Sequence, residues 1–216
     1  SSQTPKRWHY VAYDQLNIDL LPEHHTTSEL GLVFIETSWK ASQLPYHKQK
    51  LALLLSNQRN FAIEMKDLGY PIHYEFGIGS YESILEALLI NFGQISVCEP
   101  AELMLRTQLQ RLHESQSIHM LPHKGWLTSE DDFVNSVGNQ PPWRMDKFYR
   151  FIRKSKHILM DENNKPEGGE WSFDDQNRLP WDGAVELPDL PIFKPNAITR
   201  EVIEMIEKKF YHHPGK

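Results

Sequence analysis

The strongest constraint on the fold is a short run of apolar residues followed by one long amphipathic stretch. Residues 31–35 read Gly-Leu-Val-Phe-Ile without a polar side chain, a pattern typical of a strand buried on both faces of a parallel sheet. The run stops at a carboxylate, Glu36. Apolar residues then recur at the three-to-four-residue spacing of one helix face, and a glycine follows as a helix end would need: Leu51, Leu54, Leu55, Phe61, Met65 and Leu68, then Gly69. This stretch predicts a strand–helix unit with an acid at the carboxyl end of its strand.

The same unit recurs along the first half of the chain. Two further helices are predicted, one capped by Ser80 and ended by Gly93, the other starting after Pro100. Four further β-rich runs are predicted to be strands: residues 8–12, 72–76, 94–98 and 117–121. Five strands alternating with three clear helices predict an α/β fold with a doubly wound, five-stranded parallel sheet, Rossmann-like in class, and right-handed crossovers place helices on both faces.

The pattern changes after Pro122, where regular strand–helix alternation ends. The later segments are a short capped helix at 128–132, a basic aromatic helix at 144–158, a Gly-, Asn- and Asp-rich stretch at 160–178, a proline-containing linker at 179–196, and a last helix at 199–210 with Thr199 as N-cap. We expect this last helix to have too little around it to form a second core. The chain therefore divides into an α/β domain at residues 6–135 and a helical and irregular linker region at 136–216.

Composition excludes several classes of protein. A single cysteine, Cys98, rules out a disulfide, a four-cysteine zinc site and a four-cysteine iron–sulfur cluster built from this chain's own residues. No apolar run approaches the roughly 20 residues of a membrane helix, and no signal peptide is visible. We therefore expect a soluble, cytoplasmic protein without a membrane partner. The net charge of −6 argues against a uniformly basic nucleic-acid surface.

Three acids follow predicted strands and mark the candidate ligand crevice. Asp14, Glu36 and Glu99 each come directly after a strand, and in open α/β sheets ligands bind beyond the carboxyl ends of the strands. These carboxylates suit ribityl, ribose or amide-like groups, or else serve as acceptors for helix-start amides. His47 and Lys48 begin the long helix at the same edge, where they meet a ligand or form a solvated helix start.

No catalytic or metal-binding residues are predicted. The adjacent pair His24-His25 points in different directions from any helix or strand and reads as a solvated loop. The Gly77-Ile78-Gly79 turn lacks the third glycine of a dinucleotide fingerprint and reads as a plain strand–helix turn. A Walker loop, a nucleophile elbow and a zinc-protease motif are all absent from the sequence.

The basic helix carries a cationic stripe. Arg150, Arg153, Lys154 and His157 lie at positions i, i+3, i+4 and i+7, with aromatic residues interleaved. Such a face can contact DNA phosphates. It can equally dock another domain or lie in solvent.

Several ordered stretches of this sequence resemble the prokaryotic (6-4) photolyase branch of the photolyase and cryptochrome flavoproteins, also called deoxyribodipyrimidine photolyase-related proteins. The resemblance covers nearly the whole chain. It rests on Asp14-Gln15-Leu16, His47-Lys48, Leu55-Ser56, Arg59-Asn60-Phe61-Ala62, Glu99-Pro100, Met145-Asp146-Lys147-Phe148-Tyr149-Arg150, Leu159-Met160, Pro166-Glu167-Gly168-Gly169-Glu170-Trp171-Ser172-Phe173-Asp174, Asn177-Arg178 and Ile198-Thr199-Arg200-Glu201-Val202-Ile203.

The resemblance implies an amino-terminal α/β antenna domain joined by a linker to a helical domain. In that family the helical domain holds FAD, a four-cysteine iron–sulfur cluster and the DNA lesion site, and blue light drives the repair. We expect FAD, the cluster and damaged DNA to belong to such a domain beyond this chain, which alone would then be inactive. The residues here are expected to be a fragment or a truncated relative.

The resemblance also implies a ribityllumazine antenna at the carboxyl edge of the sheet. The candidate cofactor-binding residues are Asp14, Gln15, Glu36, His47, Lys48 and Glu99. Two positions depart from the family pattern, which has a glycine where this chain has Tyr13 and an acid where it has Lys40. A tyrosine side chain can fill the crevice, and a lysine reverses its local charge, so we expect lumazine to bind poorly.

Three functional hypotheses follow. The leading one is the amino-terminal domain of a light-dependent DNA-repair flavoprotein. The alternative is a stand-alone nucleotide- or lumazine-like-ligand binding module of the same fold, without enzyme activity. The third is a partner-binding protein that uses Arg150, Arg153 and Lys154.

Overall fold

The computed structural model describes residues 5–23, 25–174 and 179–216. His24 of the histidine pair and Asn177-Arg178 of the family motif lie outside the described residues. The chain forms two compact units, residues 1–125 with 193–216, and residues 126–192. This grouping differs from a division at residue 135, because the last helix joins the α/β unit.

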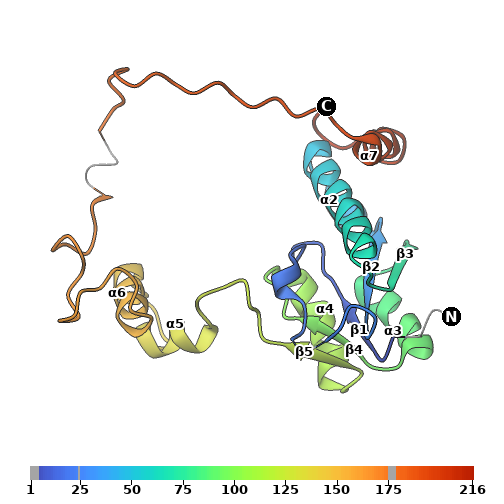
Figure 1. Cartoon of the computed structure of the whole chain (residues 1–216), viewed down its shortest axis with the longest axis horizontal. Coiled ribbons are helices and arrows are strands. Elements are labelled where there is room, and N and C mark those ends of the chain that lie inside the picture. The colour runs from blue at the N-terminus through green and yellow to red at the C-terminus, as the bar shows by residue number, and fades with distance from the viewer. Residues whose placement is uncertain (1–4, 24, 175–178) are drawn as a thin grey trace. The chain divides into compact units, whose positions relative to one another are not determined.

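A five-stranded parallel sheet forms the centre of the first unit (Figure 1). Its strands are β1 (Arg7–Tyr10), β2 (Leu30–Thr37), β3 (Ile72–Gly77), β4 (Ile95–Cys98) and β5 (Ile118–Leu121), in the order β3-β2-β1-β4-β5. The chain winds outward from β1 to β3 and then crosses back to β4, so the strand order reverses beside β1. The predicted doubly wound parallel sheet is confirmed.

Strand β2 shows why this sequence forms a parallel sheet. All eight of its residues are buried, because β1 and β3 flank it and helices cover both of its faces. Gly31 pairs with Trp8 across the sheet. A Cβ atom at Gly31 would lie 2.5 Å from the Trp8 ring, so glycine is what lets the indole lie flat against the strand.

Helices cover the two sheet faces with separate cores. Helix α2 (Lys48–Asp67) packs on one face, where its Phe61 and Met65 join a cluster with Phe34 of β2. Helices α3 (Tyr81–Phe92) and α4 (Leu103–Glu114) pack on the other face. Ser80 caps α3 as predicted, with its hydroxyl accepting from the Ser83 amide at 3.2 Å. Short helical turns at Ile18–Leu20 and at α1 (Trp39–Gln43) complete the connections.

The last helix, α7 (Ala197–Lys209), belongs to the α/β unit. It packs against α2, and Figure 1 shows it beside one end of that helix. Its N-cap is Asn196, whose side chain accepts from the Thr199 amide at 2.8 Å. The prediction of Thr199 as N-cap was therefore wrong, because an Asn side chain three residues earlier satisfies the orphan amide and starts the helix sooner.

The second unit contains α5 (Glu130–Val137) and α6 (Met145–Ser155). Ser129 and Asp132 form a capping box at the start of α5, with reciprocal contacts of 3.0 and 3.1 Å. The described residues 179–196, which lead into α7, contain neither helix nor strand. This is expected of a proline-containing linker.

The sheet core contains a histidine with a large pKa shift, His9 of β1. Its ring is buried, and Nδ1 lies 2.9 Å from the Ser96 hydroxyl of β4. Burial, with smaller effects of His25 and Lys124, lowers the pKa of His9 from 6.5 to about 3. The folded protein therefore holds this ring neutral at pH values where the unfolded chain binds a proton.

We expect His9 to make the fold acid-sensitive between pH 6.5 and about 3. Within that window the unfolded state carries the extra proton, so stability falls by about 1.4 kcal/mol per pH unit, or about 2 kcal/mol by pH 5. Urea unfolding at several pH values should show a shallower decline for His9→Gln than for wild type. The exposed neighbour His119→Gln is the control and should follow the wild-type slope; equal slopes for all three proteins would contradict the assignment.

Candidate functional site

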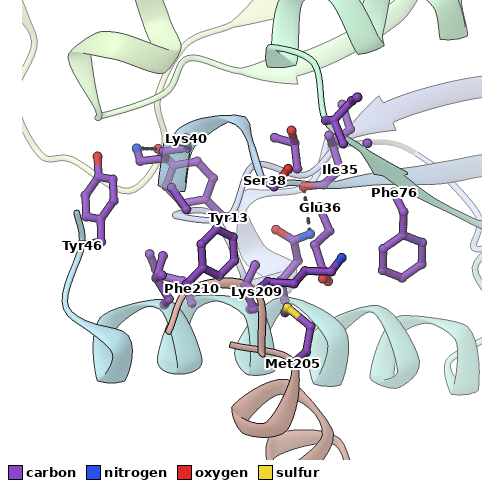
Figure 2. A pocket seen from close by; sticks show the side chains of 18 of the residues that line it. Tyr13, Ile35, Glu36, Ser38, Lys40, Tyr46, Phe76, Met205, Lys209 and Phe210 are labelled. Atoms are coloured by element: carbon purple, nitrogen blue, oxygen red, sulfur yellow. Dashed lines mark hydrogen bonds between the residues drawn. The ribbon is translucent and has the colours of Figure 1, made fainter. Parts of the chain in front are cut away.

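A cavity of about 110 Å³ lies at the carboxyl ends of β1, β2 and β3 (Figure 2). Parallel strands bring their carboxyl ends to one edge, so this is the edge where the sequence predicted a ligand crevice. Figure 2 shows Tyr13, Lys40 and Tyr46 toward one side of the cavity, and Glu36 and Phe76 toward the other. The full lining is Tyr13, Ile35, Glu36, Thr37, Ser38, Lys40, Ala41, Tyr46, Leu51, Leu54, Leu55, Gln58, Phe76, Gly77, Ile78, Tyr81, Met205, Lys209 and Phe210.

Tyr13 and Lys40, the two departures from the family pattern, contact each other. The Lys40 ammonium donates to the Tyr13 hydroxyl at 2.5 Å and to the Glu102 carboxylate at 2.7 Å. The Tyr13 hydroxyl in turn donates to Glu102. One tyrosine, one lysine and one glutamate thus form a closed hydrogen-bonded triangle at the cavity wall.

The triangle uses the hydrogen-bonding capacity of the Tyr13 hydroxyl and the Lys40 ammonium, which a ligand in the cavity would otherwise contact. Burial and then the hydrogen bond to Glu102 raise the pKa of Tyr13, so its hydroxyl stays protonated. Burial alone would raise the pKa of Glu102, but the hydrogen bonds from Lys40 and Tyr13 outweigh it and lower that pKa. Lys40 is therefore already paired with a carboxylate from its own chain.

Glu36 also has its partners within the protein. The Arg59 guanidinium of α2 binds it through two hydrogen bonds of 2.6 and 2.8 Å, and the Tyr74 hydroxyl of β3 donates at 2.8 Å. The hydrogen bond to Glu36 raises the pKa of Arg59, so the guanidinium is charged. A bidentate pair with an added hydroxyl is what allows a carboxylate to remain charged at a buried strand end.

The other predicted cofactor-binding residues at the sheet edge do not line this cavity. Asp14 is exposed. Gln15 is buried, and its amide donates to the Cys98 and Glu99 carbonyls at 2.9 and 3.1 Å, which ties the end of β1 to the end of β4. The Glu99 carboxylate lies 3.7 Å from Arg106.

The two predicted residues at the start of α2 also have structural partners. His47 is the N-cap, and its ring nitrogen accepts from the Gln49 amide at 3.2 Å. Lys48 pairs with Glu207 of α7 at 2.8 Å. Of the six predicted residues, only Glu36 lines the cavity.

Sequence reasoning missed much of the cavity wall. Glu102 does not itself line the cavity but binds Tyr13 and Lys40, which do. It had a usable signal, because it follows Glu99 in the same strand-to-helix turn. Met205, Lys209 and Phe210 had none, since they reach the cavity only through the packing of α7 on α2. Aromatic side chains from three separate segments complete the wall: Tyr46 before α2, Phe76 near the end of β3 and Tyr81 at the start of α3.

Three side chains of the cationic stripe of α6 lie against the indole ring of Trp171. The cationic groups of Arg150, Arg153 and Lys154 lie 5.5, 5.4 and 5.4 Å from the centroid of the Trp171 ring. Arg153 is buried, and it donates to main-chain carbonyls, including that of Ile158 at 3.1 Å. The stripe thus holds residues 158–171 against the helix, and Arg153 in particular faces inward.

The cavity is small beside the ribityllumazine that the family resemblance implies. Its volume of about 110 Å³ is below the roughly 150 Å³ of a cavity that takes up benzene, and a two-ring compound with a ribityl chain is larger. The cavity is partly open to solvent. Elsewhere among the described residues, no cluster of three or more metal-ligating side chains occurs. None of the described helices combines the length and the apolar character needed to span a bilayer.

We expect Arg59→Met to destabilise the protein by about 3 kcal/mol, because it leaves the Glu36 carboxylate buried without its counter-ion. The control is Glu201→Gln, which removes the exposed second partner of the same guanidinium, 2.9 Å away, and should cost less than about 1 kcal/mol. Chemical denaturation measures both. The double variant Glu36→Gln with Arg59→Met should be less destabilised than Arg59→Met alone, and the opposite order would show that Arg59 acts through packing.

Comparison with known proteins places the chain in a family. It matches the family model of the deoxyribodipyrimidine photo-lyase-related proteins over residues 9–216. A (6-4) photolyase of Agrobacterium fabrum is 30% identical over 194 residues, which are 86% of this chain and 38% of the photolyase. An uncharacterized protein of Acanthamoeba polyphaga mimivirus is 25% identical over 177 residues, which are 78% of this chain and 86% of the viral protein. The chain thus spans about two fifths of the photolyase's length, and it belongs to the deoxyribodipyrimidine photo-lyase-related protein family.

Proposed function

We propose that this chain is the amino-terminal α/β domain of a light-dependent DNA-repair photolyase-related protein. The observation that carries the proposal is an aromatic-walled cavity at the carboxyl edge of a parallel sheet, in a chain of this family. That edge is where open α/β sheets bind their ligands. A four-cysteine cluster would be held by residues other than these, since this chain has one cysteine, and FAD would be held in the same helical domain that the family resemblance implies.

In this function the crevice is of the antenna type but is closed to a large chromophore. Tyr13 fills the space that a glycine would leave, and Glu102 keeps the tyrosine and Lys40 in place through the hydrogen-bonded triangle. Glu36 is neutralised by Arg59 instead of by a ligand. With α7 in the position observed, the domain would then support the parent protein's fold and leave room for a small molecule at this site.

A second candidate function is a stand-alone ligand-binding module without enzyme activity. The observation that favours it is the viral relative, most of whose length is matched by this chain. The matched 177 residues are 86% of the viral protein, which leaves little of its length for a large additional domain. The two candidates differ in whether the native protein carries flavin, so the absorption spectrum of the protein purified from its source separates them.

Lumazine titration tests the state of the crevice. We expect wild type to bind 6,7-dimethyl-8-ribityllumazine poorly, and Tyr13→Gly with Lys40→Glu to bind it at least about tenfold tighter, the effect of one added hydrogen bond to a charged group. The matched control is Tyr13→Gly with Lys66→Glu, which makes the same charge change at an exposed residue of α2 outside the cavity wall and should gain less. Lumazine fluorescence measures all three, and a wild-type affinity equal to or tighter than that of the double variant would contradict the closed crevice.

DNA binding by this chain should be weak and strongly salt-dependent, because phosphate contacts are left to the exposed cations of α6. We expect Arg150→Gln with Lys154→Gln to lower the salt slope of binding by up to about 2. The control, Lys50→Gln with Lys66→Gln on α2, should leave the slope unchanged. Fluorescence anisotropy at several salt concentrations measures this, and a tight, salt-insensitive complex would show that another surface binds DNA.

A further inference from the structure

Helix α7 forms one wall of the cavity. Three of its residues or near neighbours, Met205, Lys209 and Phe210, line the space. In Figure 2 these three side chains approach the cavity from the side opposite the sheet. The small volume of the cavity therefore depends on where α7 lies.

The attachment of α7 is separate from the cores of the sheet. Val202, Ile206 and Phe210 are buried against Ala41 and Leu51 in a cluster of their own, distinct from the clusters on the two sheet faces. Removing α7 would expose this small cluster and leave the residues that hold the sheet together in place. Segments with few buried apolar contacts are those that open locally in folded proteins.

Two ion pairs and one amide contact hold α7 by polar groups. In each ion pair the glutamate of α7 is exposed, whereas the cation of α2 is largely buried, with 15% of the Arg59 side chain and 11% of the Lys48 side chain accessible. A pair with one partner in water contributes modestly to attachment. The contacts are Glu201 with Arg59 at 2.9 Å, Glu207 with Lys48 at 2.8 Å, and Asn196 with Asn60 at 2.8 Å.

The two ends of α7 are held differently. On its amino side, residues 179–196 form an extended connection without helix or strand. On its carboxyl side, the turn after the helix is fastened to the start of α2: the Lys48 amide donates to the Pro214 carbonyl at 2.9 Å, and His213 Nδ1 donates to the Tyr46 carbonyl at 2.9 Å. The amino end of α7 thus follows an irregular connection, whereas its carboxyl end is held to the start of α2 by two hydrogen bonds.

We propose that α7 is a detachable lid, and that its departure from α2 widens the partly open cavity for a ligand larger than the space now present. This inference rests on the proposed function only for the chemical nature of the ligand. The movement itself is a property of the protein alone. It can be measured without any ligand, so its failure and the failure of the lumazine prediction are distinguishable.

Cysteine labelling measures the opening of the lid. Leu51→Cys places a thiol beneath α7, because Leu51 is buried in the α7 cluster and lines the cavity. The native Cys98, buried in β4, reports opening of the sheet in the same molecule. With iodoacetamide, and each rate normalised to that of the unfolded chain, we expect the introduced thiol to react at least about tenfold faster than Cys98. Equal normalised rates would overturn the lid, since α7 would then leave only when the whole unit unfolds.

A pair of neighbouring residues on α7 provides the matched test. In the Leu51→Cys protein, Val202→Ala removes a fully buried contact and should speed labelling of the introduced thiol about tenfold while leaving Cys98 unchanged. Ile203→Ala, which truncates a more exposed side chain on the same turn, should change it less than about twofold. Equal effects of the two truncations would overturn the proposal. Hydrogen exchange of the wild-type protein keeps the test independent of these variants: amides of α7 should exchange faster than those of β2, and equal protection would contradict a lid.

Discussion

Complete burial of β2 is the constraint on which the rest of the structure depends. A strand with eight buried residues needs a neighbour on each side and a helix layer on each face, and β1, β3, α2 and α3 supply them. At its carboxyl end, the buried side chain of Glu36 accepts hydrogen bonds from Arg59 and Tyr74. Because Arg59 belongs to α2, this contact holds α2 over the sheet edge. The cavity is the space left where these elements stop.

The fold was predictable because its pattern is local. A β-rich run followed by helical spacing identifies each strand–helix unit without knowledge of the others, a closing glycine marks two of the helices, and parallel order follows from their alternation. The site was predictable only in part. The edge was identified correctly and Glu36 lines the cavity, but the directions of side chains beyond a strand end depend on turn geometry. Gln15 therefore points back to the carbonyls after β4, and Asp14 points to solvent.

Long-range packing explains why the surroundings of α6 and α7 could not be predicted from the sequence pattern. Periodicity correctly placed Arg150, Arg153 and Lys154 on one face of α6, but it carries no information about the loop that returns to that face. The carbonyls of residues 158–171 and the ring of Trp171 turn this face into a packing surface. In the same way α7 was predicted as a helix from its own spacing, while its docking on α2 depends on residues about 150 positions away in sequence.

The hydrogen-bonded triangle of Tyr13, Lys40 and Glu102 has a consequence for how such proteins diverge. Each member stabilises the other two, so a lineage that replaces one of them alone leaves a buried hydroxyl or a charge without its partner. The two departures from the family pattern, Tyr13 and Lys40, are then energetically coupled, so exchanging both together should cost less stability than the sum of the two single exchanges. Reversing only one of the two residues would cost stability in the same way, so the coupling favours keeping both residues in the crevice.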